Sequence, residues 1–332
     1  MAIISRATLL EWCDRLGVVH IPVRSRWVTV LAYHRVCDCT DTPWDPDVIS
    51  ATPAAFDRQM AFVRKNFTPI GSSRIIRWLH GSASLPRNPI IVTFDDGYRD
   101  NHDVALPILR RQAIPADFFV CPWYIENRRL FWWDRIAFCL KKTDKDSVEL
   151  TYPSRMSLRT DNSEAIEASR HQALHIVKHT PRLKIERFVG GMERAAEIKP
   201  DEEKRADELI MTWDQVRALR DAGMGIGSHS FSHPVLPMVD QRTVSHELTR
   251  SRFMLESRLG EPVQMLAFPV GSFREGTKEL AQRAGYDLAY SYSSGASFLG
   301  RFDPYEVRRL AVERHHSLSL FRARSAMPFL AG

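Results

Sequence analysis

The feature that most constrains the fold is an alternation, from residue 27 onward, of short apolar segments with longer segments of helical periodicity. The apolar segments are rich in β-branched and aromatic residues and are predicted as strands. These strands are 27–33, 89–94, 116–121, 224–228, 264–269, 286–292 and 305–312. Helices are predicted between them at 53–66, 100–112, 213–222, 240–259 and 276–284. This order predicts an α/β protein with a parallel sheet, either doubly wound or closed into a barrel.

One region interrupts the alternation. Residues 125–212 are rich in charged residues and hold few β-branched segments, so we interpret them as a mainly helical insertion within the main domain. The favoured role is a structural cover, and the alternative is a wall of the substrate cleft. The main domain is then predicted at 27–124 and 213–325, after an N-terminal helical segment at 1–26 and before a tail at 326–332. The aromatic residues expected to pack the insertion are Phe131, Trp132, Trp133 and Phe138.

Composition excludes several classes of protein. With 44% hydrophobic and 26% charged residues, the chain has the composition of a soluble globular enzyme and not of a disordered or fibrous protein. The net charge of +6 is dispersed, without the basic stripe of a nucleic-acid binder. Five cysteines without a CxxC pair favour a reducing compartment. No signal peptide or membrane span is read, so we expect a cytoplasmic protein, with peripheral contact to the inner face of the membrane through the N-terminal segment.

Candidate catalytic residues are sought directly after strands, because ligands of parallel α/β proteins bind at the carboxyl ends of the strands. Asp95 and Asp96 follow the apolar strand 89–94. Two adjacent carboxylates there would repel each other and lose hydration unless a cation or a proton neutralised one of them. A metal ion is the natural neutraliser, and a plain turn with an Asx cap is the structural alternative.

A pair of histidines follows the strand 224–228. His229 and His233 are four residues apart, a spacing that lets two imidazoles bind one zinc-type ion. The chain supplies a comparison, because His171, His175 and His179 repeat this spacing on the predicted insertion helix. Those three follow no strand and accompany no carboxylate pair, so they are interpreted as a solvated face.

His34 ends the first strand, where a side chain that titrates near neutrality suits a proton donor. Without further context a structural histidine is the alternative. Cys37 and Cys39 lie nearby, but a Cys-x-Cys pair without further ligands gives little support to a second metal site.

A Pro-x-Gly turn after strand 264–269 is a candidate for presenting a backbone N–H to an oxyanion, or is only a turn. Together with the residues above it completes a constellation: an Asp and two His form an open zinc-type site that activates water, and a second Asp is left as base. The residues of this turn are Phe268, Pro269, Val270 and Gly271.

Two motifs at these positions resemble those of a known family. TFDDG at 93–97 and HSFSHP at 229–234 resemble the first two motifs of the polysaccharide deacetylases, the NodB-homology family also classed as carbohydrate esterase family four. The segments 211–236 and 51–70 are also similar to members of that family. The resemblance covers about 27–325, apart from the insertion. It implies a distorted (β/α)₇ barrel and metal-dependent hydrolysis of N-acetyl groups from amino sugars.

Carried over to this chain, the resemblance implies that Asp95 is the catalytic base and that Asp96, His229 and His233 bind one divalent metal. Zn²⁺ is expected, with Co²⁺, Mn²⁺, Ni²⁺ and Fe²⁺ as alternatives. The segment LAFPVG at 266–271 resembles the version of the third motif seen in the exopolysaccharide N-deacetylase branch, which lacks the usual base-orienting Arg. Arg308 and Arg309 are the candidates to replace it.

The general acid is predicted from the same branch, in which a YHxV-type motif at the first strand supplies it. Tyr33-His34-Arg35-Val36 resembles that motif, so His34 is expected to be the acid, with His315 or His316 as the alternative.

The expected substrate is an N-acetylated glycan or its lipid- or nucleotide-linked precursor. Removal of O-acetyl or N-formyl groups, and an inactive glycan-binding relative, are the other possibilities.

Overall fold

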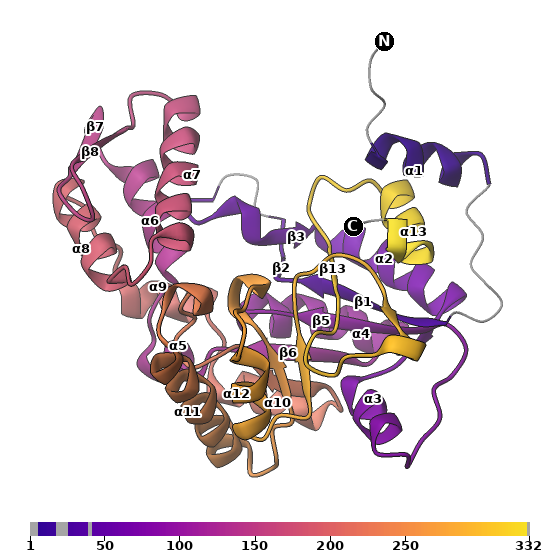
Figure 1. The fold of residues 1–332 in the computed structure, drawn as a ribbon. Coiled ribbons are helices and arrows are strands. Elements are labelled where there is room, and N and C mark those ends of the chain that lie inside the picture. The colour runs from indigo at the N-terminus through magenta and orange to yellow at the C-terminus, as the bar shows by residue number, and fades with distance from the viewer. Residues whose placement is uncertain (1–5, 18–25, 39–41, 331–332) are drawn as a thin grey trace.

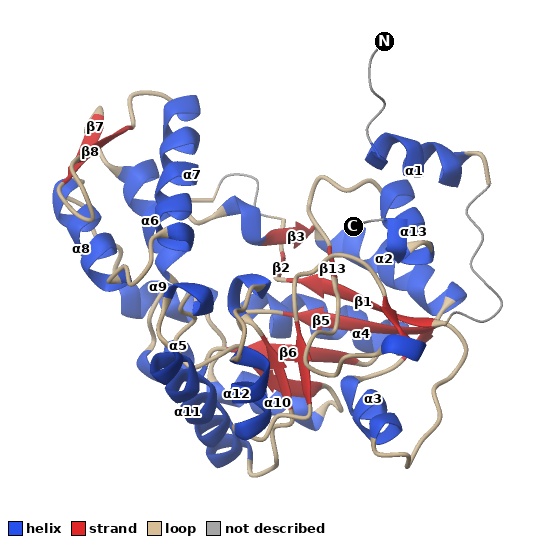
Figure 2. Cartoon of the chain, viewed as in Figure 1, coloured by secondary structure: helices blue, strands red, loops and turns tan. Residues whose placement is uncertain are grey.

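A parallel sheet curled into a distorted barrel forms the centre of the computed structural model, which describes residues 6–17, 26–38 and 42–330 (Figures 1 and 2). In β13, Leu310 pairs with Leu31, and Val307 just before it bridges Tyr290, so this segment closes the ring between β11 and β1. The predicted distorted (β/α)₇ barrel is confirmed. The barrel strands are β1 (Trp27–Tyr33), β5 (Pro89–Phe94), β6 (Ala116–Val120), β9 (Gly225–Ser228), β10 (Met265–Ala267), β11 (Leu288–Tyr290) and β13 (Leu310–Ala311).

The interior of the barrel is filled by alternate residues of its strands, as the period of two requires. Val30, Ile91, Phe119 and Tyr290 belong to one buried apolar cluster, and α3 (Ser72–Leu79) adds side chains to it from the amino-terminal ends of the strands. Gly227 faces the Phe119 ring, where a Cβ atom would lie 2.5 Å from the ring carbons. Side chains therefore fill the barrel toward the amino-terminal ends of its strands. A site can form only at the carboxyl ends.

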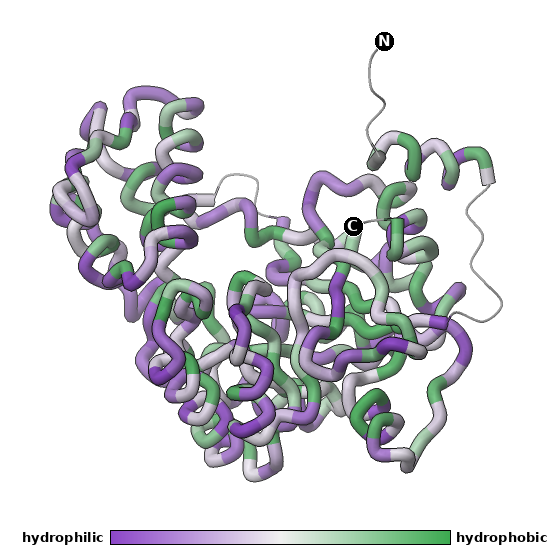
Figure 3. Tube along the Cα trace, viewed as in Figure 1, coloured by the Kyte–Doolittle hydropathy of each residue, from purple (hydrophilic) through white to green (hydrophobic). Residues whose placement is uncertain are grey.

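Helices cover the outside of the barrel and bury the other face of each strand. The outward residues, such as Leu31, Val92 and Phe118, share a cluster with Phe56 and Met60 of the first of these helices. The outer helices alternate between hydrophilic and hydrophobic residues along their length (Figure 3). They are α2 (Pro53–Asn66), α4 (Leu106–Gln112), α5 (Pro122–Asn127), α10 (Trp213–Asp221), α11 (Gln241–Leu259) and α12 (Thr277–Arg283).

The helix predicted at 100–112 differs in detail, because it opens with a π-helical turn, Asn101–Ala105, before α4. Pro107 lies just inside α4 and has no N–H to donate to the preceding turn, which favours the wider turn. The strand predicted at 305–312 is shorter than expected, because the chain there passes from one partner strand to the other.

The predicted insertion projects to one side of the barrel and is mainly helical, with one antiparallel hairpin (Figure 1). Phe131, Trp132 and Trp133 are buried in the main cluster, and Phe138 packs against it. The elements are α6 (Trp132–Lys142), β7 (Ser147–Leu150), β8 (Met156–Arg159), α7 (Ser163–His179), α8 (Ile185–Ala195) and α9 (Glu202–Leu209).

Short elements complete the fold. The helix α1 (Arg6–Arg15) lies beside α13 (Leu318–Ala326), and Leu10 of α1 packs against Leu320 and Ala323 (Figure 1). The predicted segment 1–26 and tail 326–332 lie partly outside the described residues. None of the helices in the described ranges is both long and apolar enough to span a membrane. The remaining strands are β2 (Arg35–Val36), β3 (Ile49–Ala51), β4 (Thr68–Pro69) and β12 (Ser297–Phe298).

Candidate active site

Strand register brings the candidate residues together at the carboxyl ends of the strands. Tyr33 pairs with Phe94, so the residues that follow, His34 and Asp95, lie side by side on neighbouring strands. The Asp95 N–H donates to the Tyr33 carbonyl at 2.9 Å, which extends the ladder by one bond. On the other side of the barrel the His229 N–H donates to the Val120 carbonyl at 2.9 Å. Each of these side chains continues the inward face of its strand.

Asp96, His229 and His233 form a buried group whose ligating atoms all lie within 4.8 Å of one another. The Nε2 atoms of His229 and His233 are each 3.5 Å from Asp96 Oδ1. His229 Nδ1 contacts the Ala267 carbonyl at 2.8 Å, which assigns the proton to Nδ1 and leaves the lone pair of Nε2 facing Asp96.

The electrostatics of this group fit the binding of a divalent cation. Asp96 Oδ1 is buried and has no hydrogen-bond partner among the residues that the structure describes. Burial, and then the neighbouring Asp95 charge, raise the pKa of Asp96 well above its usual range. Burial lowers the pKa of both His229 and His233, so both rings are neutral, as metal ligands must be. One carboxylate and two neutral imidazoles match the ligand set of a zinc-type ion with an open position.

Asp95 has a different environment, because a buried arginine holds both of its oxygens. Arg309 donates from Nη1 to Oδ1 at 2.7 Å and from Nη2 to Oδ2 at 2.8 Å, and both side chains have zero exposure. Burial alone would raise the pKa of Asp95, but the Arg309 charge and hydrogen bonds lower it to about 2. Asp95 is therefore an ionised, oriented carboxylate beside a second carboxylate that no Lys or Arg of the described ranges pairs with.

Backbone strain is concentrated at the same place. Asp96 has a φ of 77°, Ser230 of 61°, His233 of 54° and Val270 of 57°, all in the left-handed region that non-glycine residues rarely adopt. Each such residue costs about 1–3 kcal/mol and persists only where its surroundings enforce it, which is typical of functional sites.

The family model for polysaccharide deacetylases matches residues 82–289, a range that contains Asp95, Asp96 and both histidines. The chain belongs to the polysaccharide deacetylase family.

Two curated relatives match shorter stretches. The chain is 24% identical over 113 residues to the putative polysaccharide deacetylase YxkH of Bacillus subtilis (strain 168), which is 34% of the chain and 40% of that relative. It is 27% identical over 114 residues to the poly-beta-1,6-N-acetyl-D-glucosamine N-deacetylase of Escherichia coli O157:H7, which is 34% of the chain and 16% of that relative. The chain thus matches less than half the length of each.

Solved structures support the fold. The deacetylase PplD of Streptococcus pyogenes, solved in complex with acetate, superposes with a TM-score of 0.58 at 15% identity, over 91% of this chain and 98% of that one. IcaB from Ammonifex degensii superposes with a TM-score of 0.57 at 17% identity, over 93% of this chain and 99% of that one.

Arg309, and not Arg308, contacts Asp95 in this deacetylase-family chain. The side chain of Arg308 is exposed and donates to the Ser294 carbonyl at 3.2 Å. The two residues alternate across the strand, so only one of them faces the interior. Sequence alone left both as candidates because the short β13 did not fix the register.

His34 lies at the mouth of the barrel, where the Tyr292 hydroxyl is 3.2 Å from His34 Nε2. Burial lowers the pKa of His34 to about 4, against the opposing effect of the Asp95 charge, so the ring is neutral at neutral pH. Tyr292 was not predicted as a site residue, although it follows Leu288 and Tyr290 at a spacing of two and so continues the inward face of β11.

The residues considered as an alternative general acid or as further metal ligands lie outside the cleft or outside the described residues. His315 is 76% exposed and, with His316 and Glu313, forms a cluster outside the cleft. His175 and His179 stack on the exposed surface of α7, as expected for a solvated face. Of the Cys-x-Cys pair, Cys39 lies outside the described residues.

The turn after β10 matches its predicted role only in part. Pro269 has no N–H, and the Gly271 N–H donates to the Phe268 carbonyl at 2.8 Å, so neither can serve an oxyanion. Val270 is the one residue of this turn that lines the cleft, and only its N–H remains a candidate donor.

A cleft of about 280 Å³ opens above the site. Its wall includes residues that the sequence analysis did not assign to the site, because they come from distant segments. The barrel contributes His34, Asp96, His229, His233, Val270 and Tyr292; the segment 45–48 contributes Asp45, Asp47 and Val48; and the insertion contributes Trp132, Trp133, Leu174 and Lys178. The insertion therefore forms part of the cleft, which was the alternative to a purely structural cover.

Proposed function

We propose that this chain hydrolyses the N-acetyl group of an amino sugar in a glycan or glycan precursor, releasing acetate and a free amine. The observation that carries the proposal is the pairing of two unlike carboxylates in one cleft. Asp95 is ionised and oriented by Arg309, whereas Asp96 faces two neutral histidines and has no ion pair with a Lys or Arg in the described part of the chain. This is the arrangement that metal-assisted hydrolysis of a linear amide requires.

Asp96, His229 and His233 would hold one divalent ion, with Zn²⁺ as the proposed metal. When bound, such an ion supplies a Lewis acid that lowers the pKa of water and stabilises negative charge on the acyl oxygen. Asp96 Oδ1, buried and without a hydrogen-bond partner in the described ranges, would be a ligand atom for this ion.

Asp95 and His34 would move the protons. Asp95 accepts a proton from the attacking water, whose oxygen bonds to the acyl carbon. A carboxylate with a pKa of about 2 holds a proton weakly, and the neutral His34 lies at matching register on the next strand. We propose that the proton passes through one intervening water to His34 and from there to the amide nitrogen as the C–N bond breaks, because an amide nitrogen leaves poorly as an anion. Amine and acetate result.

Acetate release tests the function directly. Purified protein should release acetate from members of a panel of N-acetylated glycans with their lipid- and nucleotide-linked forms, and a chelator should abolish the release. Release of formate from N-formyl sugars, or of acetate from O-acetyl esters alone, would assign a different deacylase. No release from any substrate, together with glycan binding, would identify an inactive relative.

The metal site predicts a contrast between two histidine variants. His229→Ala removes a buried ligand, so divalent-ion content per chain should fall severely. His175→Ala changes an exposed ring on α7 and should leave the ion content unchanged. Elemental analysis of both variants measures this, and equal loading would show that the ligands lie elsewhere.

His34→Ala should lower kcat strongly on amide substrates, by about 10²–10⁴-fold, because the leaving nitrogen would lack its proton donor. It should lower the rate much less on an activated aryl ester, whose leaving group needs no proton. Metal content should stay that of the parent protein. His316→Ala serves as the control, and if it proved the inactive variant, the assignment of the acid to His34 would be wrong.

We also propose a cytoplasmic location with membrane contact through α1. Leu9, Trp12 and Leu16 are 57%, 59% and 73% exposed, while Leu10 packs on α13. Exposed apolar side chains of this kind insert into the interfacial region of a bilayer. Co-sedimentation with anionic vesicles tests the contact, and Trp12→Ala should reduce the bound fraction. Equal binding of parent and variant, or no binding, would contradict it.

A further inference from the structure

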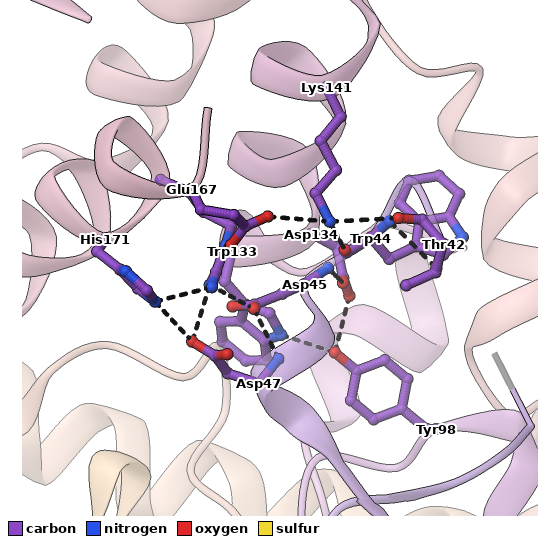
Figure 4. A network of polar contacts seen from close by, with 11 residues as sticks. Thr42, Trp44, Asp45, Asp47, Tyr98, Trp133, Asp134, Lys141, Glu167 and His171 are labelled. Atoms are coloured by element: carbon purple, nitrogen blue, oxygen red, sulfur yellow. Dashed lines mark hydrogen bonds and ion pairs between the residues drawn. The ribbon is translucent and has the colours of Figure 1, made fainter. Parts of the chain in front are cut away.

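The insertion is fixed to the barrel by a buried arginine. Arg170 of α7 is 1% exposed and donates from Nη1 to Asp45 Oδ1 at 2.7 Å and to Asp47 Oδ2 at 2.9 Å. Its Nε donates to Glu167 at 2.8 Å. Figure 4 shows Asp45, Asp47 and Glu167 converging between α7 and the segment that precedes β3. A buried guanidinium with three carboxylate partners holds these elements in one arrangement.

A second set of contacts joins the same segment to α6. Lys141 donates to the carbonyls of Thr42 and Trp44 at 3.3 and 3.2 Å (Figure 4). Asp134 accepts from the Asp45 N–H at 3.0 Å and from the Tyr98 hydroxyl at 2.7 Å. The segment 42–48 and the helices α6 and α7 thus form one rigid wall above the metal-ligand group.

Lys178 is the cation that this wall presents to the cleft. It lies eight residues after Arg170, with Leu174 midway, so the three residues share one face of α7. Leu174 and Lys178 both line the cleft, and Lys178 is the one Lys or Arg among the described residues that line it. In the described part of the chain no carboxylate lies within ion-pair distance of Lys178. Asp45 and Asp47, the acidic residues of this wall that line the cleft, are both ion-paired with Arg170, and Asp45 also interacts electrostatically with Lys178 at longer range.

We propose that Lys178 binds an anionic group on the sugar substrate, a phosphate or a carboxylate. This inference rests on the proposed function and names the substrate class of the same site. An ammonium that has no ion pair among the described residues, on a rigid and partly apolar wall, forms charge-assisted hydrogen bonds with such a group at little ordering cost. The cleft volume of about 280 Å³ lies at the small end for ligand sites, which suits one acetylated sugar and its charged substituent.

The proposal is tested with N-acetylglucosamine 1-phosphate against the uncharged methyl glycoside of N-acetylglucosamine. For the parent, kcat/KM should be about tenfold or more higher on the phosphorylated sugar, the size expected of a hydrogen bond to a charged group. Lys178→Met should remove this preference by raising KM for the phosphorylated sugar alone. Lys178→Arg should keep it, and Lys142→Met, an exposed lysine of the same insertion, should behave as the parent. An N-acetylated disaccharide that carries a uronic acid next to the acetylated sugar tests whether the anionic group is a carboxylate.

Several outcomes would overturn the proposal. One is an equal loss on charged and uncharged substrates in Lys178→Met, because a merely structural role would produce it. Another is the absence of any preference for either charged substrate in the parent. If the parent hydrolyses none of these substrates, calorimetric binding of N-acetylglucosamine 1-phosphate to the metal-loaded protein still decides, with about tenfold weaker binding expected in Lys178→Met. A failure of hydrolysis with retained, Lys178-dependent binding would contradict the proposed function and not this inference.

Discussion

An Asp95→Asn variant should bind the divalent ion as the parent does and lose hydrolysis by about 10²–10⁴-fold, the usual contribution of a general base. The reason is the difference between the two carboxylates. Asp95 is held by Arg309 and is not one of the grouped ligand atoms, whereas Asp96 faces both histidines. Acetate release and elemental analysis on the same preparation measure both quantities.

Asp117→Asn is the matched control for this experiment. Asp117 is also a buried, inward-facing aspartate, but it lies in β6 toward the closed end of the barrel, where it accepts from the Ser72 N–H at 2.8 Å. Burial raises the pKa of Asp117 to about 6, against the opposing Ser72 hydrogen bonds. Its amide variant should keep the parent rate, so a loss in both variants would indicate a general effect of removing buried carboxylates. A normal rate in Asp95→Asn would contradict the mechanism.

The residues that follow strands could be located from the sequence because the side-chain period of a strand is fixed. Once 89–94 is a buried strand, residues 91, 93 and 95 must share a face, and the same argument places His34 after β1. The ends of parallel strands meet at one edge, so Asp95, His34 and His229 had to converge. Strand periodicity predicted where these residues lie, and the family resemblance predicted the role of each.

The rest of the cleft depends on contacts that no local pattern encodes. Lys178 and Trp132 lie far along the chain from the strands, and they reach the cleft because Arg170 joins α7 to Asp45 across 125 residues. Charged residues of the insertion resemble a solvated face in the sequence, and only tertiary packing shows that Arg170 is buried. Likewise, the choice between Arg308 and Arg309 required the register of the two-residue strand β13.

Arg309→Met should be among the most destabilising single substitutions in the barrel. Removing one partner of a buried, hydrogen-bonded ion pair leaves the other charge without compensation and costs about 3–5 kcal/mol. Among the described residues, the ion-pair-distance contact left to the buried Asp95 would be the neutral His229, whose Nε2 is 3.9 Å from Asp95 Oδ2. Denaturant unfolding of the variant measures the loss. Arg308→Met, which alters the exposed neighbour, should change the free energy of unfolding by no more than about 0.5 kcal/mol.

The double variant Asp95→Asn/Arg309→Met separates the pair from its surroundings. If the cost of Arg309→Met arises from an unpaired Asp95 charge, replacing that charge as well should recover part of the lost stability, and the two single effects should not add. Contacting residues in one network show coupling of about 0.5–3 kcal/mol in such cycles. Additive effects would mean that Arg309 stabilises the barrel through its packing over the Tyr292 ring, 4.7 Å away, and not through the carboxylate. In that case the activity lost in Asp95→Asn would come from the loss of the base alone, because the position of Arg309 would not depend on the carboxylate.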